Sequence, residues 1–189
     1  LAHLAVAKCA DHLPIYRLEK EFARNGAPIA RSTMNELLHR ASALLARVRE
    51  LAGGRVVRVG ILDDAPKDVA AGEEPSDLTI LEVAVLHEFG APPHLPMRSF
   101  IRATVDERRA EIGELQAKLT VQVLEGKITP EQALNLLGAK VASWVQAKIA
   151  SNIPPALAES TLKGRPNGGT VALVDTGQLK SSITWKVEG

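Results

Sequence analysis

The chain has 189 residues, 46% of them apolar, so it is long enough for one main domain with a small appendage and too short for two ordinary domains. Its 23 Lys and Arg residues nearly cancel its 22 Asp and Glu residues, which disfavours a dedicated nucleic-acid binder with a basic surface. No run approaches the roughly 18 apolar residues of a membrane span, so we expect a soluble protein without a membrane partner.

The only cysteine is Cys9, which rules out an internal disulfide and a site with several cysteine ligands. A single cysteine fits a protein that is assembled in a reducing cytoplasm. We expect Cys9 to be a small buried hydrophobe, because His3 and His12 are the only bases near it in sequence and no activating motif surrounds it.

The N-terminal part of the chain differs in character from the rest. A turn signal at residues 25–28 (NGAP) is followed by Ser32 and Thr33, either of which can cap a new helix. Residues 35–51 then repeat apolar side chains at helical spacing until two glycines stop the pattern. We expect an N-terminal helical extension at residues 1–33 and a main domain at residues 34–189.

A strand is expected at residues 55–62 (RVVRVGIL), because a period of two places Val57, Val59 and Ile61 on one face. The next segment, residues 63–77, carries six acidic residues and almost nothing to bury. We predict a long mobile loop there. Calcium binding is the alternative, but the alternating ligand spacing of a calcium loop is missing.

Three helices are predicted in the middle of the chain. A capping box of Thr79 and Glu82 opens the first, and Gly90 is suited to a left-handed cap at its end. After a proline-rich turn, a longer helix is expected to begin near Met97 or Arg98. The third begins with a capping box at residues 129–132 and ends before the prolines at 154 and 155.

The C-terminal region is predicted to contain a turn, two short strands and a brief helix. Residues 163–170 (KGRPNGGT) form a flexible turn, and residues 171–174 (VALV) are a short strand candidate. Asp175 is expected to cap a brief helix in DTGQL, and residues 182–188 (SITWKVE) form a closing strand.

We expect no catalytic constellation, and therefore no enzyme. His87-Glu88 suggests a zinc protease, but residue 91 is Ala where a second histidine is needed, and His94 lies beyond two prolines. An end-of-helix structural role is the simpler interpretation. Neither a nucleophile elbow nor a complete phosphate-binding loop occurs, and Trp144 and Trp185 suit core or interface positions better than base stacking. No metal or cofactor is expected.

Residues 55–188 resemble the virion-morphogenesis proteins of tailed bacteriophages, the tail-completion or head–tail joining family. The resemblance rests on the order and spacing of several segments: VRVGIL, EVAVLHEFG, PMRSFIRA, the break at Pro154-Pro155-Ala156-Leu157, and LVDTGQL followed by SIT. It implies an α+β fold with a small twisted antiparallel sheet packed against two long helices. It also implies a structural subunit of a ring, expected to be hexameric, located in the virion neck and assembled in the host cytoplasm.

The partners implied by this resemblance are further copies of the chain, head connector or stopper proteins, and the tail tube or tail terminator protein. No specific nucleic acid is implied, although packaged DNA would pass through the lumen. The residues singled out as interface or architectural positions are His87, Glu88, Phe89, Gly90, Arg98, Phe100, Asp175, Thr176, Gly177 and Leu179. Filling the core is an equal alternative for Phe89 and Phe100, and capping and a tight turn account for residues 175–177 without a ligand.

Residues 5–33 (AVAKCADHLPIYRLEKEFARNGAPIARST) resemble a stretch of an insertion-sequence transposase family that lies upstream of its catalytic core. None of that family's catalytic acids can be placed here. We interpret the segment as a transposon remnant upstream of a phage gene with Met34 as a candidate start. A helical extension with a chance resemblance is the alternative. A DNA-transaction protein derived from a transposase is the second functional hypothesis, and a toxin or host-interaction module is the third.

Overall fold

The computed structural model describes residues 4, 7–8, 11–62, 78–165 and 169–189, so the predictions for Cys9 and for the acidic loop at 63–77 lie outside it. The chain forms two compact units. Unit 1 consists of Leu1–Gly53 with Leu124–Gly126, and unit 2 of Gly54–Val123 with Lys127–Gly189. The division at Gly53 follows the end of a helix that begins before the predicted boundary at residue 33.

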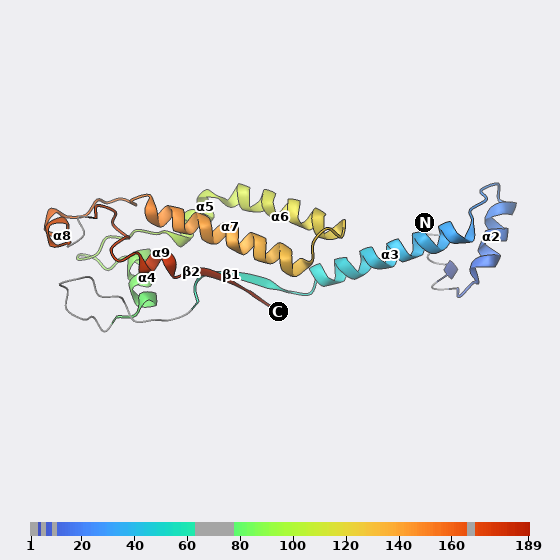
Figure 1. Cartoon of the computed structure of the whole chain (residues 1–189), viewed down its shortest axis with the longest axis horizontal. Helices are drawn as coiled ribbons and strands as arrows, with labels where there is room; N and C mark the ends of the chain where they lie inside the picture. Colours follow the sequence, from blue (N-terminus) through green and yellow to red (C-terminus); the bar gives the residue numbers. More distant parts are fainter. Residues whose placement is uncertain (1–3, 5–6, 9–10, 63–77, 166–168) are drawn as a thin grey trace. The chain divides into compact units, whose positions relative to one another are not determined.

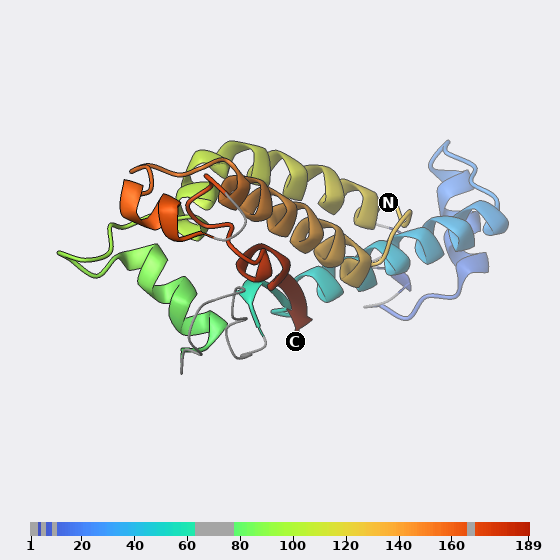
Figure 2. The ribbon, with the colours of Figure 1, turned by 60° about the vertical axis from the view of Figure 1, so that its left-hand side comes forward.

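Unit 1 is helical. Helices α2 (Ile15–Arg24) and α3 (Arg31–Leu51) lie crosswise in both ribbon views, joined by a turn in which Gly26 has a φ of +77° (Figures 1 and 2). A small core holds them together, with Leu18 and Met34 both fully buried. Such a core is the source of stability for short helices.

The predicted cap of α3 by Ser32 or Thr33 is wrong. The chain is extended at Ala30 and helical from Arg31, so both hydroxyl residues already lie in the first turn. The helix at residues 35–51 is confirmed, but its apolar spacing does not mark a buried face throughout. Exposed side chains in the distal half include Leu44, Leu45, Val48 and Leu51.

Unit 2 contains a two-stranded antiparallel sheet of β1 (Val56–Ile61) and β2 (Ile183–Glu188), with Val56 opposite Glu188 and Ile61 opposite Ile183. Both strands were predicted. Val57, Val59 and Ile61 pack against the core as their alternation indicated. The fold is α+β, as expected.

Helix α7 (Pro130–Ala150) packs against both strands. Thr129 and Gln132 form its predicted capping box. Gly138 faces the sheet so closely that a Cβ there would lie 2.6 Å from Cδ1 of Trp185. Helix α6 (Arg109–Leu124) runs beside α7 (Figure 2), and buried side chains such as Leu119 and Val123 form a shared cluster.

Helix α4 (Ile80–Phe89) has the predicted Thr79–Glu82 capping box. Gly90 ends it with φ 75° and ψ 165°, which is not the left-handed helical cap that was expected. A glycine is still required, because a Cβ at residue 90 would lie 2.9 Å from the backbone nitrogen of Met97.

The long helix expected from Met97 or Arg98 is two helices, α5 (Ile101–Glu107) and α6, which are separated at Arg108. Its start is later because the segment before Phe100 runs in a non-helical path that the carboxylate of Glu88 ties to α4. Phe100 itself is fully buried in the cluster that α7 and β2 share.

The C-terminal predictions need two corrections. Residues 171–174 form a turn, not a strand, because the Arg165 side chain and Asn152 satisfy their backbone groups. Asp175 does not cap α9 (Gln178–Ser181), which begins after Gly177 with no side-chain cap. Helix α8 (Glu159–Gly164) precedes this region. Across the part of the chain that is described, no helix is both long and apolar enough to cross a membrane.

Candidate functional site

A pocket of about 380 Å³ brings together segments that are far apart in sequence. It is bounded by α4, the turn at residues 94–96, residues 156–165 around α8, and residues 172–179, which include the start of α9. Six of the ten residues singled out from the sequence line it: His87, Arg98, Asp175, Thr176, Gly177 and Leu179. The segments HEFG, PMRSF and LVDTGQL thus meet at one place, which we call the arginine pocket.

Arg98 is the most buried cation of the arginine pocket, with 4% of the residue exposed. Its Nε and Nη2 both donate to the carbonyl of Pro155, at 3.0 and 2.8 Å, and its backbone N–H donates to the carbonyl of His87 at 2.7 Å. Arg98 therefore ties three segments together from the inside instead of projecting from the surface. Burial lowers the pKa of its guanidinium, and the charge of Arg165 lowers it further.

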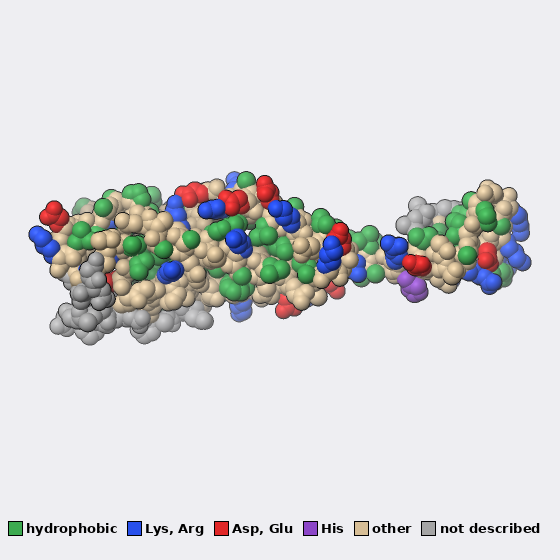
Figure 3. Space-filling model, turned by 45° about the horizontal axis from the view of Figure 1, so that its top comes forward, with side chains coloured by type: hydrophobic (Ala, Val, Ile, Leu, Met, Phe, Trp, Pro, Cys, Tyr) green, Lys and Arg blue, Asp and Glu red, His purple; other side chains and the backbone are tan. Residues whose placement is uncertain are grey.

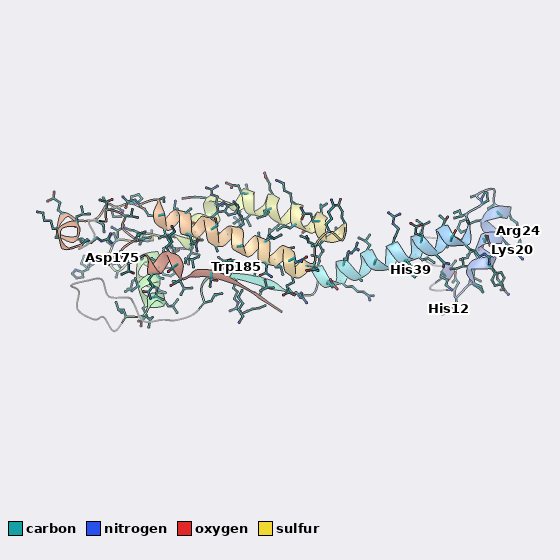
Figure 4. All side chains as sticks on the ribbon, viewed as in Figure 1. His12, Lys20, Arg24, His39, Asp175 and Trp185 are labelled. Carbon is teal, nitrogen blue, oxygen red and sulfur yellow. The ribbon has the colours of Figure 1, made fainter. Side chains whose placement is uncertain are left out.

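Arg165 was not singled out from the sequence. Its Nη1 donates to the carbonyls of Gly169, Val171 and Val174, and its Nη2 to the carbonyl of Ala172. Its Nε lies 3.7 Å from Oδ1 of Asp175, so the carboxylate predicted to cap a helix neutralises this arginine. Figure 4 shows Asp175 beside α9. The sequence feature that could have drawn attention to Arg165 is that it is the only arginine in a glycine- and proline-rich turn.

Glu88 performs a structural task at the end of α4. Its carboxylate accepts hydrogen bonds from Ser99 Oγ at 2.6 Å and from the backbone N–H groups of Phe100, Ile101 and Arg102 at 2.8 to 3.0 Å. Burial alone would raise the pKa of Glu88, but these hydrogen bonds outweigh it and hold the pKa below its ordinary value. The side chain thus caps α5 from another helix.

Phe89 and Phe100 have different environments. Phe100 is fully buried, whereas Phe89 is 60% exposed on α4 with the Arg102 guanidinium 4.9 Å from its ring centroid. Leu81 and Val85 precede Phe89 at intervals of four residues and are also exposed. Leu179 is buried, and Gly177 adopts a left-handed conformation that begins α9.

His87 and His94 both line the arginine pocket although they lie on different segments. Among the residues with described positions, no three His, Cys, Asp or Glu side chains are grouped closely enough to hold a metal ion. The arginine pocket thus brings together two arginines, two histidines, Asp175 and apolar side chains.

The surface of unit 1 has a different chemistry. Lys20 and Arg24 extend outward from α2 in Figure 4, and Lys and Arg side chains gather over α2 in Figure 3. Unit 1, with residues 1–53 and 124–126, contains eight Lys and Arg against six Asp and Glu, a formal charge of +2, whereas unit 2 contains 15 against 16, a charge of −1. The chain as a whole is nearly neutral because the net positive charge of unit 1 is partly offset by the net negative charge of unit 2.

A family model described as the IS66 family of transposases matches residues 1–75. No curated protein and no solved structure matches the chain. The N-terminal part of the chain is thus similar to IS66 transposases, over a longer stretch than residues 5–33. The match ends before α4 and includes no residue of the arginine pocket. Nothing in these comparisons resembles phage tail-completion proteins, so that resemblance stays a prediction.

Proposed function

We propose that the chain combines two parts of different origin: an N-terminal part derived from an insertion-sequence transposase, which contains unit 1 and reaches into the start of unit 2, and a unit 2 that serves as a structural subunit of a bacteriophage neck. In this proposal unit 2 assembles as a ring between the head connector and the tail tube and catalyses no reaction. Closed cyclic symmetry allows each copy to satisfy two different surfaces without open polymerisation.

The observation that supports the structural role is the way unit 2 uses its charged residues. The side chains of Glu88, Arg98 and Arg165 make ten of the hydrogen bonds described above, and all serve to fix loops and helix ends. Buried charges that are held in place by hydrogen bonds to backbone groups give a fixed surface, which an assembly subunit needs.

Native mass spectrometry and electron microscopy of the purified full chain test this proposal. We expect closed rings, with six copies as the predicted number, either alone or after addition of tail tubes. A chain that stays monomeric at every concentration and in the presence of tail tubes would contradict it.

A second candidate function, contact with DNA by unit 1, is favoured by the IS66 match and by the arrangement of α2 and α3. Two crossed helices joined by a turn are the form of a helix-turn-helix, in which the start of the second helix enters the major groove. Exposed side chains at the start of α3 include Arg31, Ser32 and Asn35, and Asn and Arg are suited to base edges.

Fluorescence anisotropy of a labelled duplex with the full chain tests this candidate. Lys20→Ala combined with Arg24→Ala should weaken binding and lower its dependence on salt by about two phosphate contacts, because both cations are exposed. Lys118→Ala, an exposed cation of unit 2, is the matched control. Equal binding by the double variant and the control would exclude DNA contact through α2. Metal-dependent strand transfer by the chain would instead contradict the structural proposal.

A further inference from the structure

Among the described residues that line it, the arginine pocket has more cationic than anionic side chains. Its lining contains two guanidiniums, Arg98 and Arg165, and one carboxylate, Asp175. Asp175 lies beside Arg165. No carboxylate of the described residues is within ion-pair distance of Arg98, and the hydrogen bonds of its side chain to these residues all go to the carbonyl oxygens of Pro155 and Ala156.

The guanidinium of Arg98 also has unused donors. Its Nε and Nη2 donate to backbone carbonyls, but its Nη1 makes no hydrogen bond to any residue whose position is described. A guanidinium carries five N–H donors in a planar fork that matches an oxyanion. Arg98 lines the pocket, and its Nε and Nη2 are held by the carbonyl of Pro155. The guanidinium is therefore preorganised to bind an oxyanion.

The rest of the lining is largely apolar, with Ile80, Val83, Leu157 and Leu173 among its members. The volume of about 380 Å³ exceeds the space that a single small ion needs. A ligand with one negative charge and an aliphatic stem would therefore match both the net charge and the walls. A phosphate dianion would leave its second charge uncompensated and the apolar walls unused.

We propose that the arginine pocket binds a carboxylate carried on an aliphatic stem, with Arg98 as the residue that receives it. The two sources of this chemistry are a free carboxylic acid and an acidic side chain or carboxyl terminus of a partner polypeptide. This inference does not depend on the neck assignment, because it rests on the charge and shape of the pocket alone.

Butyrate is the simplest probe, and butyramide is its neutral counterpart. We would titrate each into the ¹⁵N-labelled full chain and follow the Nε–H signals of Arg98 and Arg165 by NMR. Butyrate should shift the Arg98 signal saturably, and butyramide and inorganic phosphate should not. A peptide ending in an aliphatic residue, with a free or an amidated carboxyl terminus, distinguishes the sources, because tighter binding of the free peptide than of butyrate indicates a polypeptide partner.

Replacing Arg98 itself would disturb folding, so the decisive variants lie at the rim. Thr161→Asp places a carboxylate in the lining from an exposed position of α8 and should abolish the butyrate shift, whereas Ser160→Asp on the same helix is outside the lining and should preserve it. Asp175→Asn raises the net charge of the lining and should tighten butyrate binding by roughly threefold or more.

Three results would overturn the proposal: no saturable shift with butyrate, an equal response to butyramide, or preferential binding of phosphate. Loss of binding in both Thr161→Asp and Ser160→Asp would also contradict it, because a general electrostatic effect would then suffice. Ring formation measured on the same samples separates a failure of this inference from a failure of the proposed neck function.

Discussion

Replacing Glu88 by Gln tests whether one buried carboxylate organises the junction between α4 and α5. The two side chains have nearly the same shape, so the change removes the charge and turns one acceptor oxygen into a donor NH₂ group. Oε2 accepts from the backbone N–H groups of Phe100 and Ile101, and Oε1 from Ser99 and Arg102. The glutamine amide must therefore face at least one backbone N–H with another donor.

The expected cost follows from these contacts. A buried N–H without an acceptor costs about 1–3 kcal/mol. Loss of a negative charge at the start of α5 adds up to about 2 kcal/mol in a partly buried site. We therefore expect Glu88→Gln to lower the free energy of unfolding by about 2–4 kcal/mol, although the carboxylate touches no ligand.

Urea unfolding followed by circular dichroism measures this difference. Glu114→Gln is the matched control, because Glu114 is exposed on α6 and its replacement should change the free energy of unfolding by less than about 0.5 kcal/mol. If Glu88→Gln were as stable as this control, the carboxylate would not be the cap of α5 and the explanation of the later helix start would fail.

Three further predictions follow from the same region and from the sheet. The pKa of Glu88 in the folded protein lies below its ordinary value of 4.5, so the contribution of its charge to the free energy of unfolding is complete above about pH 4.5 and is lost as the pH falls through the folded pKa. The urea midpoints of the wild type and Glu88→Gln should therefore converge only in acid. Gly90→Ala should destabilise the fold by about 1–3 kcal/mol in the same assay, because φ is +75° and the Cβ meets Met97. Gly138→Ala should cost about 1–3 kcal/mol and alter the fluorescence of Trp185, which its Cβ would displace; unchanged emission would refute the close approach.

Local signals predicted both strands of the sheet and the starts of α4 and α7. The capping boxes at Thr79 and Thr129 need only residues three positions apart, so the sequence was enough to find them. The alternation in β1 likewise indicated its buried face. The cap of α5 was missed, because the capping carboxylate of Glu88 is twelve residues from Phe100 and arrives from another helix.

The sequence identified several of the residues that line the candidate site but did not indicate what each residue does there. Arg98 was expected to be an interface anchor, and for Phe100 an interface anchor and a core residue were equal alternatives. Both are buried, because the turn before α5 folds them inward against Pro155 and the core. Phe89 remains exposed because it lies on the opposite side of α4 from the arginine pocket. Sequence spacing could not distinguish these cases, since burial here depends on which distant segment covers each side chain.

Electron microscopy of particles from cells lacking this gene tests the central claim most directly. A head–tail joining role predicts filled heads and finished tails that lie side by side without being joined. Normal joined particles would contradict the neck assignment, and DNA contact by unit 1 would then be the function to pursue.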